Sequence, residues 1–136
     1  MRIIVGYGND LRGEDAFGVD VVNLLQKQKL KDTKLISAYQ LTPEICLELL
    51  DADEIVFVDA AFSNENHYAI ACDIMEQQNV NLSHHISPKV VISLLNSVYN
   101  KFPKFLIYSM LTNEFDTILD VDKYNKSLKS VVDFFK

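Results

Sequence analysis

Residues 54–59 have the sequence Glu-Ile-Val-Phe-Val-Asp, a run of apolar residues enclosed by two acids. An unbroken run of β-branched and aromatic residues is typical of a strand that is buried on both faces of a parallel sheet. Residues 2–7 (RIIVGY), 34–38 (KLISA) and 104–109 (KFLIYS) are predicted to be strands of the same sheet. We therefore expect these segments to form its centre.

Segments with helical spacing alternate with these strands. The predicted helices are residues 16–28, 42–50, 87–99 and 121–134. Thr42-Pro43 and Ser87-Pro88 each place a capping residue before a proline at the first helical position. Residues 63–75 are strand-like without a preceding helix, and we expect them to add one antiparallel strand. The pattern predicts an α/β fold, a three-layer sandwich with a mostly parallel twisted sheet of about five strands and helices on both faces.

The composition fits one globular domain over residues 1–136, because 49% of the residues are hydrophobic and 24% are charged. A net charge of -6 argues against a nucleic-acid-binding protein, which needs a basic face. No apolar run is long enough to span a membrane, and the first predicted strand starts at Arg2, which leaves no room for a secretion signal. We expect a soluble, cytoplasmic monomer.

All four glycines fall in residues 6–18 (GYGNDLRGEDAFG), directly after the first predicted strand. Glycine permits positive φ and close backbone approach, so this clustering predicts a loop of defined shape. The loop is not a dinucleotide-binding fingerprint, because Leu11 stands where the third glycine should be and no acid ends the second strand. It is not a phosphate-binding P-loop either, because no Gly-Lys-Ser/Thr follows.

Acids and histidines are placed where the predicted loops meet. Asp15 follows Glu14 at the start of the first predicted helix, Asp59 is the last residue of a predicted strand, and His84 and His85 precede another predicted helix. Sites in such sheets form beyond the carboxyl ends of the strands. Two aspartates and a histidine suit a first-row divalent ion with open coordination positions. The remaining histidine, at position 67, is expected to be structural or solvated.

Several motifs together resemble the hydrogenase maturation proteases. These are residues 5–18 (VGYGNDLRGEDAFG), 40–44 (QLTPE) and 56–60 (VFVDA), the pattern His84-x-x-Ser87-Pro88, and Tyr99 followed by Pro103. Members of that family begin with a strand, Gly-x-Gly-Asn, and Gly-Asp-Asp before a further glycine. The matches run through most of the chain in the family's order, so the resemblance implies a single domain of this type over residues 1–136.

The resemblance implies a nickel-dependent endopeptidase of the aspartyl type. Its partner would be the large-subunit precursor of a nickel–iron hydrogenase, from which it removes a C-terminal extension after nickel has been inserted. Asp15, Asp59 and His84 would bind the nickel and carry the catalysis, with His85 as the competing assignment. The nickel would be carried by the substrate, and cadmium or zinc would be expected to occupy the site in vitro.

Further residues are expected to contact the substrate. Gly8 and Asn9 would shape the cleft, Gln40 would line it, and Glu14 would aid proton transfer. The sequence departs from the family at two places. Glu14 replaces the first aspartate of the acidic pair, and Lys89 stands directly after Ser-Pro, where some members have the histidine.

Two other functions are compatible with the same pattern of acids. A receiver-like signalling module would also have acids near the first strand and at the end of a central one. It would need a lysine after the last strand, where residues 110–114 read MLTNE. The second alternative is a relative with the same fold and another peptide substrate, because a fold does not name a substrate.

Overall fold

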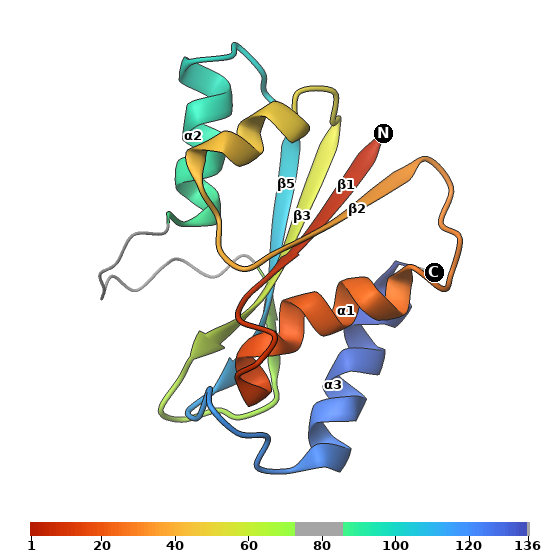
Figure 1. Ribbon diagram of the computed structural model, residues 1–136, viewed down its shortest axis with the longest axis vertical. Coiled ribbons are helices and arrows are strands. Elements are labelled where there is room, and N and C mark those ends of the chain that lie inside the picture. Colours follow the sequence, from red (N-terminus) through yellow and green to blue (C-terminus); the bar gives the residue numbers. More distant parts are fainter. Residues whose placement is uncertain (73–85, 136) are drawn as a thin grey trace.

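A five-stranded sheet forms the centre of the computed structural model, which describes residues 1–72 and 86–135. The strands are β1 (Arg2–Tyr7), β2 (Thr33–Ala38), β3 (Glu54–Phe62), β4 (Ile70–Cys72) and β5 (Lys104–Thr112). Their order is β2-β1-β3-β5-β4, and only the β4–β5 pair is antiparallel in the part of the chain that is described (Figure 1). The predicted sheet and its single antiparallel strand are confirmed.

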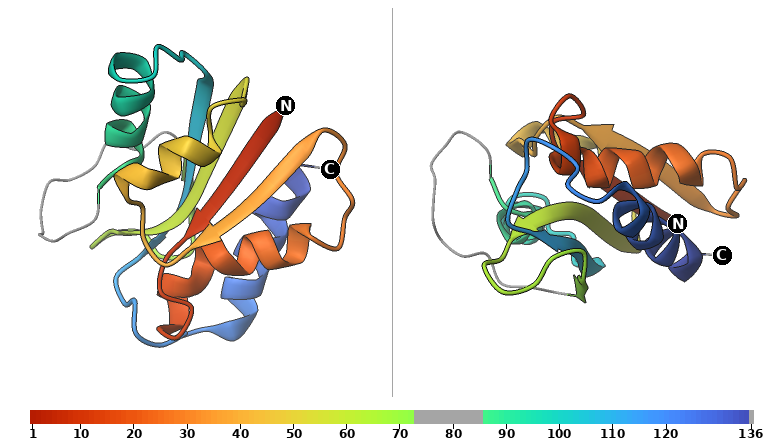
Figure 2. Two further views of the ribbon diagram at one scale, coloured as in Figure 1. Left: turned by 45° about the horizontal axis from the view of Figure 1, so that its top comes forward. Right: turned by 90° about the horizontal axis from the view of Figure 1, so that it is seen from below.

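Helices cover both faces of this sheet (Figures 1 and 2). They are the 3₁₀ helix η1 (Gly13–Ala16), α1 (Phe17–Leu25), the 3₁₀ helix η2 (Pro43–Glu48), α2 (Pro88–Ser97) and α3 (Val121–Phe134). The helices α1 and α3 lie on one face, and η2 and α2 lie on the other. The predicted three-layer arrangement is therefore confirmed.

Two predicted helices differ from the observed ones. The segment predicted as 42–50 is a short 3₁₀ helix, η2, in which Pro43 takes the expected position but the Thr42 side chain makes no capping hydrogen bond. The segment predicted as 16–28 begins earlier, as η1, and its α-helical part ends at Leu25. Short helical segments often adopt the tighter i→i+3 pattern, which a period read from sequence does not separate from an α-helix.

The pleat of the sheet divides the core into two clusters. Ile3, Val5 and Phe57 pack with η2 and α2, whereas Ile4 and Val58 pack with α1 and α3. Successive residues of a strand point to opposite faces of the sheet. Asp59 is two residues after Phe57, so it points to the same face as Phe57, towards η2 and α2. This alternation decides which polar residues share a site.

The chain reverses its winding direction between β1 and β3. β1 pairs with β2 on one side and with β3 on the other, and the β1–β3 register ends at Gly6 opposite Val58. In open α/β sheets, a crevice forms beyond the carboxyl ends of the strands at such a point. Asp59 is the first residue of β3 past this pairing.

The β3 and β5 strands are longer than predicted. From the sequence, the two strands are predicted to end at Asp59 and Ser109. In the structure, β3 continues to Phe62 and β5 to Thr112, and the pairing between them is unbroken. These residues stay extended because β3 pairs with β5 and because β5 also pairs with β4. Asp59 therefore lies within a strand and does not terminate it.

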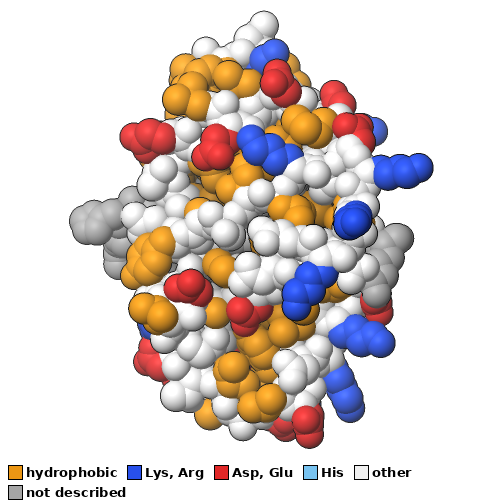
Figure 3. Space-filling view, turned by 45° about the vertical axis from the view of Figure 1, so that its right-hand side comes forward, with side chains coloured by type: hydrophobic (Ala, Val, Ile, Leu, Met, Phe, Trp, Pro, Cys, Tyr) orange, Lys and Arg blue, Asp and Glu red, His pale blue; other side chains and the backbone are white. Residues whose placement is uncertain are grey.

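The surface mixes side chains of different kinds. On the face in Figure 3, hydrophobic side chains form small groups separated by charged ones. Scattered groups of this kind are normal and do not by themselves indicate a docking site. Within residues 1–72 and 86–135, no helix has the length and apolar character required to cross a membrane.

The start of α3 provides a test of local stability. Asp120 is its N-cap, and Oδ1 accepts a hydrogen bond from the Lys123 backbone N–H at 3.1 Å. We expect Asp120→Ala to lower the free energy of unfolding by about 1 kcal/mol, because it removes this cap. Urea denaturation measures the change. Asp122→Ala, in the same first turn, is the control and should cost only about 0.5 kcal/mol; equal losses would contradict a capping role.

Candidate functional site

Asp59 is a nearly buried carboxylate that neighbouring strands hold in place. The residue is 8% exposed, and its side chain lies between Tyr7 of β1 and Ser109 of β5. The Tyr7 hydroxyl donates a hydrogen bond to Oδ2, and the Ser109 hydroxyl donates one to Oδ1 at 2.5 Å. A buried carboxylate is tolerated when donors satisfy it in this way. These bonds orient Asp59 at the carboxyl end of β1, where the winding direction of the chain reverses.

Asp15 lies in η1 and is more accessible, with 24% of its side chain exposed. Its Oδ2 accepts a hydrogen bond from the Asn9 backbone N–H at 3.1 Å and lies 4.0 Å from the Arg12 guanidinium. Oδ1 has no hydrogen bond from the residues that the structure describes. The loop therefore fixes Asp15 through Oδ2.

The conformation of Gly8 allows the loop to close around Asp15. Its φ is +145°, and a Cβ placed on it would lie 2.1 Å from the Asp15 carbonyl oxygen. Only glycine adopts this conformation and this approach without strain. The glycine clustering seen in the sequence thus has a direct structural reason at this position.

Both aspartates are attached to the same short stretch of chain. Tyr7, the last residue of β1, donates to Asp59, and Asn9 donates to Asp15. The structure therefore brings the two predicted acids to the carboxyl end of β1, at the crevice where a site is expected. Their catalytic and ligand roles remain predictions.

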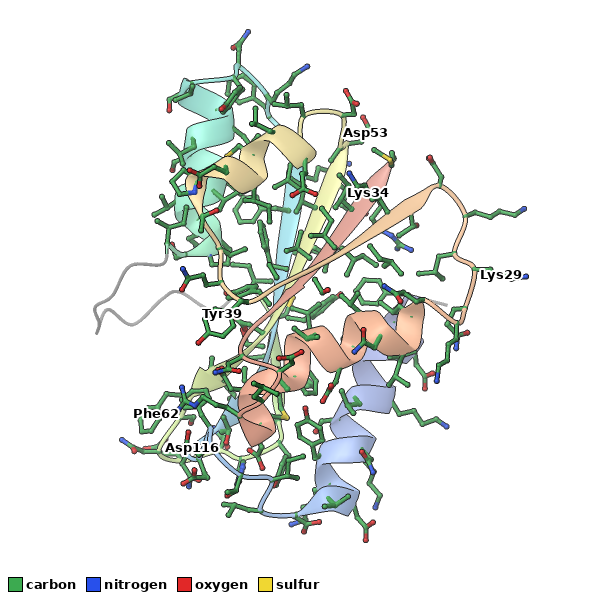
Figure 4. All side chains as sticks on the ribbon, viewed as in Figure 1. Lys29, Lys34, Tyr39, Asp53, Phe62 and Asp116 are labelled. Carbon is green, nitrogen blue, oxygen red and sulfur yellow. The ribbon has the colours of Figure 1, made fainter. Side chains whose placement is uncertain are left out.

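The predicted cleft residues lie on the loops next to these acids. The Asn9 side chain accepts from the Leu11 N–H at 2.9 Å and donates to the Tyr39 hydroxyl at 3.3 Å. Gln40 follows Tyr39 after β2 and is half-buried. Tyr39, which is labelled in Figure 4, is 64% exposed, and Leu11 is 88% exposed. This edge of the sheet therefore presents apolar surface beside the acids.

The predicted histidine ligand cannot be placed. His84 and His85 lie outside the described residues, so the choice between them stays a prediction. Among residues 1–72 and 86–135, no group of three or more His, Cys, Asp or Glu side chains could hold a metal ion. The metal-binding roles of Asp15 and Asp59 therefore also stay predictions.

Glu14 has a different environment from Asp15, although the two are adjacent. It is completely buried. Its carboxylate is the centre of a network with hydrogen bonds from Thr112 Oγ1 (2.5 Å), the Tyr68 hydroxyl (2.5 Å), the Leu119 N–H (3.1 Å) and His67 Nε2 (2.8 Å). Thr112 and Met110 are two residues apart in β5, so their side chains point to the same face of the sheet. Met110 packs with α1 and α3, so the Glu14 network lies on that face, opposite the side chain of Asp59.

The network keeps Glu14 ionised. Burial raises the pKa of Glu14, but the hydrogen bonds from Thr112, Tyr68 and His67 outweigh burial and hold this pKa below its ordinary value. Burial and the bond to Glu14 raise the pKa of Tyr68 to about 12. The structure does not place Glu14 where substrate could reach it, so its predicted part in proton transfer has no support from the geometry. His67 is structural, one of the two expectations for it.

The lowered pKa of Glu14 predicts an acid-sensitive fold. Stability from this group is complete above the ordinary carboxyl pKa of about 4.3 and is lost as the pH falls through the lower, folded-state pKa. We expect Glu14→Gln to be less stable at pH 7 and to lose less stability between pH 5 and pH 3 than the wild type. Urea denaturation at several pH values measures both. The exposed variant Glu65→Gln should follow the wild type, and an unchanged acid slope in Glu14→Gln would contradict the assignment.

Sequence reasoning missed Tyr7 and Ser109. Both are polar residues within apolar strands, on either side of Asp59 in the sheet. Once the strand order is known, the register identifies Ser109, because it pairs directly with Asp59. The sequence alone offered only the presence of a hydroxyl near the end of each strand.

Known structures share this fold. No protein-family model and no curated sequence matches the chain. The hydrogenase maturation protease HycI of Thermococcus kodakarensis superposes with a TM-score of 0.72 at 21% identity, covering 98% of this chain and 91% of that one. The maturating endopeptidase HybD of E. coli gives 0.68 at 20% identity, with 98% and 90% covered. A hydrogenase 3 maturation protease gives 0.76 at 11% identity, with 100% and 89% covered. At the level of the fold, the resemblance read from the motifs is confirmed.

Proposed function

We propose that this chain, which has the fold of hydrogenase maturation proteases, is an endopeptidase that processes a hydrogenase large-subunit precursor. It removes the C-terminal extension after nickel insertion, and it acts as a cytoplasmic monomer. The observation that supports this most is the attachment of Asp15 and Asp59 to residues 7–9, at the crevice of a sheet shared with such enzymes.

In this proposal the nickel belongs to the substrate. Asp15 and Asp59 supply two oxygen ligands, and His84, or His85 in its place, supplies a nitrogen. The precursor itself completes the coordination of the ion. An incomplete protein ligand set suits a site that recognises a metal already held by its substrate. Cadmium or zinc should bind the same residues in vitro, since imidazole and carboxylate accept these ions.

Peptide hydrolysis needs a water molecule, an activated carbonyl and a proton carrier. The substrate's nickel either polarises the scissile carbonyl or activates the water, the two standard roles of such an ion. Asp59 has donors on both oxygens and is suited to fixed positioning. Asp15 is more exposed, and the carboxylate oxygen that does not bind the ion is suited to transfer the water's proton to the departing amine. The water oxygen forms a bond to the carbonyl carbon, and the carbon–nitrogen bond breaks as that amine leaves, which produces a new C-terminal carboxylate and the free extension peptide.

The neighbouring loops would hold the extension peptide. Gly8 and Asn9 shape the cleft beside Asp15, and Gln40 lines it from the end of β2. The exposed side chains of Leu11 and Tyr39 offer apolar contacts next to the same residues. Substrate binding on loops around a rigid sheet is the common arrangement in α/β enzymes.

Incubation with a nickel-loaded large-subunit precursor tests the proposal. Mass spectrometry should show release of one C-terminal peptide, and a precursor already lacking its extension should stay intact. The substrate is validated by a maturation protease known to cleave it. If that enzyme releases the peptide and this chain does not, the proposed activity is wrong. A relative with another peptide substrate would give that result.

The receiver-like alternative is not favoured by the fold. Receiver domains of the flavodoxin-like type have the strand order 2-1-3-4-5. Here β4 lies at the edge of the sheet and is antiparallel to β5. The residues after β5 are Asn113 and Glu114, where a receiver would have its lysine.

A further inference from the structure

We infer that Glu14 is a positioning residue, which sets the location of Asp15 by anchoring η1 to segments that are distant in the sequence. The inference rests on the proposed function, because it concerns the residue assigned to the substrate's nickel. Glu14 itself touches neither substrate nor metal in this account.

The anchor joins η1 to three other parts of the fold. Thr112 ends β5, His67 and Tyr68 precede β4, and Leu119 precedes α3. All of them donate hydrogen bonds to one buried carboxylate. A charged group with four donors and no exposed surface has little freedom to move, so it fixes the backbone that carries it.

Asp15 is also held by the segment between β5 and α3, which contains Leu119. Its backbone N–H donates to the Phe115 carbonyl at 3.1 Å and to the Arg12 carbonyl at 2.8 Å. The Arg12 guanidinium in turn contacts Asp116 at 2.6 Å. Figure 4 shows Asp116 and Phe62, the end of β3, at the same end of the molecule. The turn that carries Asp15 is therefore fixed both at Glu14 and along residues 115–116.

The conformation of Tyr68 indicates that the network serves more than packing. Its φ is +71°, a region that side chains other than glycine rarely adopt, and its ring stacks on His67 at 3.8 Å and 10°. Hydrogen bonds hold it there, since the hydroxyl accepts from the Asp120 N–H at 2.8 Å and the carbonyl from Ser127 Oγ at 2.6 Å. Backbone strain of this kind persists where the surrounding structure imposes it, and it clusters at functional sites.

Small displacements of a catalytic group are costly, which explains why an anchor would be retained. Glu14 and Asp15 are joined by one peptide unit with Cα atoms about 3.8 Å apart, so a shift of Glu14 also displaces Asp15. A displacement of about 1 Å can lower a rate roughly 100-fold. The anchor thus links a buried network on one face of the sheet to an acid at the crevice.

Two substitutions at one position separate positioning from stability. Thr112→Val keeps the shape of the side chain and removes the hydroxyl, which donates to Glu14 and also accepts from the Glu114 N–H at 3.0 Å, whereas Thr112→Ser keeps the hydroxyl. Tyr68→Phe removes another donor to Glu14 and leaves the bond to Glu114 in place, so an effect common to both variants is attributed to Glu14. A control away from this network is Tyr124→Phe, which removes a hydroxyl that donates to Asp20 of α1 at 2.7 Å. Each variant is first shown to be folded by circular dichroism and thermal unfolding. Glu14→Gln and Tyr68→Phe test the same network if Thr112→Val does not fold.

The first measurement is hydrogen exchange of the Asn9 amide by NMR, which reports on Asp15 directly because this N–H donates to Asp15 Oδ2. We expect Thr112→Val to exchange about tenfold faster, and Thr112→Ser and Tyr124→Phe to match the wild type. The second measurement is cadmium affinity by calorimetry. We expect Thr112→Val to bind cadmium about tenfold more weakly, and Thr112→Ser and Tyr124→Phe to match the wild type. Cleavage should show a lower kcat together with a higher KM, because Asp15 contacts the substrate's nickel both before and during the reaction.

The outcomes distinguish the inference from the proposed function. Wild-type exchange at Asn9 in Thr112→Val, Glu14→Gln and Tyr68→Phe would overturn the positioning role, whatever the wild type binds. A wild-type protein that binds no cadmium and cleaves no precursor would overturn the proposed function, while the exchange result still decides the positioning of Asp15. Loss of exchange protection in Tyr124→Phe as well would show a general loosening and overturn the specific role of Glu14.

Discussion

Asp59→Asn is expected to lower precursor processing by at least about 100-fold while the protein stays folded. Asparagine has nearly the volume of aspartate, so the site between Tyr7 and Ser109 can accommodate it. The amide has no negative charge, however, and carboxylate is the better ligand for a divalent cation. Single-turnover cleavage and cadmium titration measure the loss, and circular dichroism checks the fold.

Asp20→Asn is the matched control for Asp59→Asn. Asp20 is partly buried and also accepts a hydrogen bond from a tyrosine hydroxyl, that of Tyr124. Burial raises the pKa of Asp20, so an uncharged side chain is tolerated there. We expect this variant to cleave within about threefold of the wild-type rate. Cleavage by Asp59→Asn in that same range would remove Asp59 from the catalytic site.

Gly8→Ala is expected to reduce processing and cadmium affinity by about tenfold or more. The added Cβ would lie 2.1 Å from the Asp15 carbonyl oxygen, at a φ of +145° that alanine rarely adopts. The loop must shift to relieve this contact, and Asp15 shifts with it. We also expect a loss of about 1–3 kcal/mol in the free energy of unfolding, measured by urea denaturation.

The neighbouring residue provides the control for Gly8→Ala. Asp10 is exposed and belongs to the same loop, so Asp10→Ala changes a side chain without requiring the backbone to move. Its activity should equal that of the wild type. If Gly8→Ala binds cadmium normally, the close approach of this loop is not what positions Asp15.

Most of the sheet could be predicted from the sequence, because long apolar runs have few alternatives to a buried strand. The ends of β3 and β5 could not. Residues 60–62 and 110–112 carry no strong local preference, and they are extended because they pair with each other. Pairing between strands distant in sequence is a tertiary effect that local propensity does not contain.

Only part of the candidate site could be predicted from the sequence, because the rest depends on contacts between residues that are distant in the chain. Asp59 was identifiable as a charge at the end of an apolar run, and the clustering of glycines marked the loop that holds Asp15. The different environments of Glu14 and Asp15 could not be predicted from the sequence. They depend on Tyr68, Thr112 and Leu119 meeting at one carboxylate, although these residues lie more than 50 positions away in the chain.

The nickel dependence of cleavage tests the central claim most directly. The same precursor is prepared with and without nickel, and release of the C-terminal peptide is followed by mass spectrometry. We predict release from the nickel-loaded precursor alone, and no release from either form by Asp15→Asn or Asp59→Asn. Equal release from both forms, or release by the two variants at the wild-type rate, would contradict recognition of substrate-borne nickel by these aspartates.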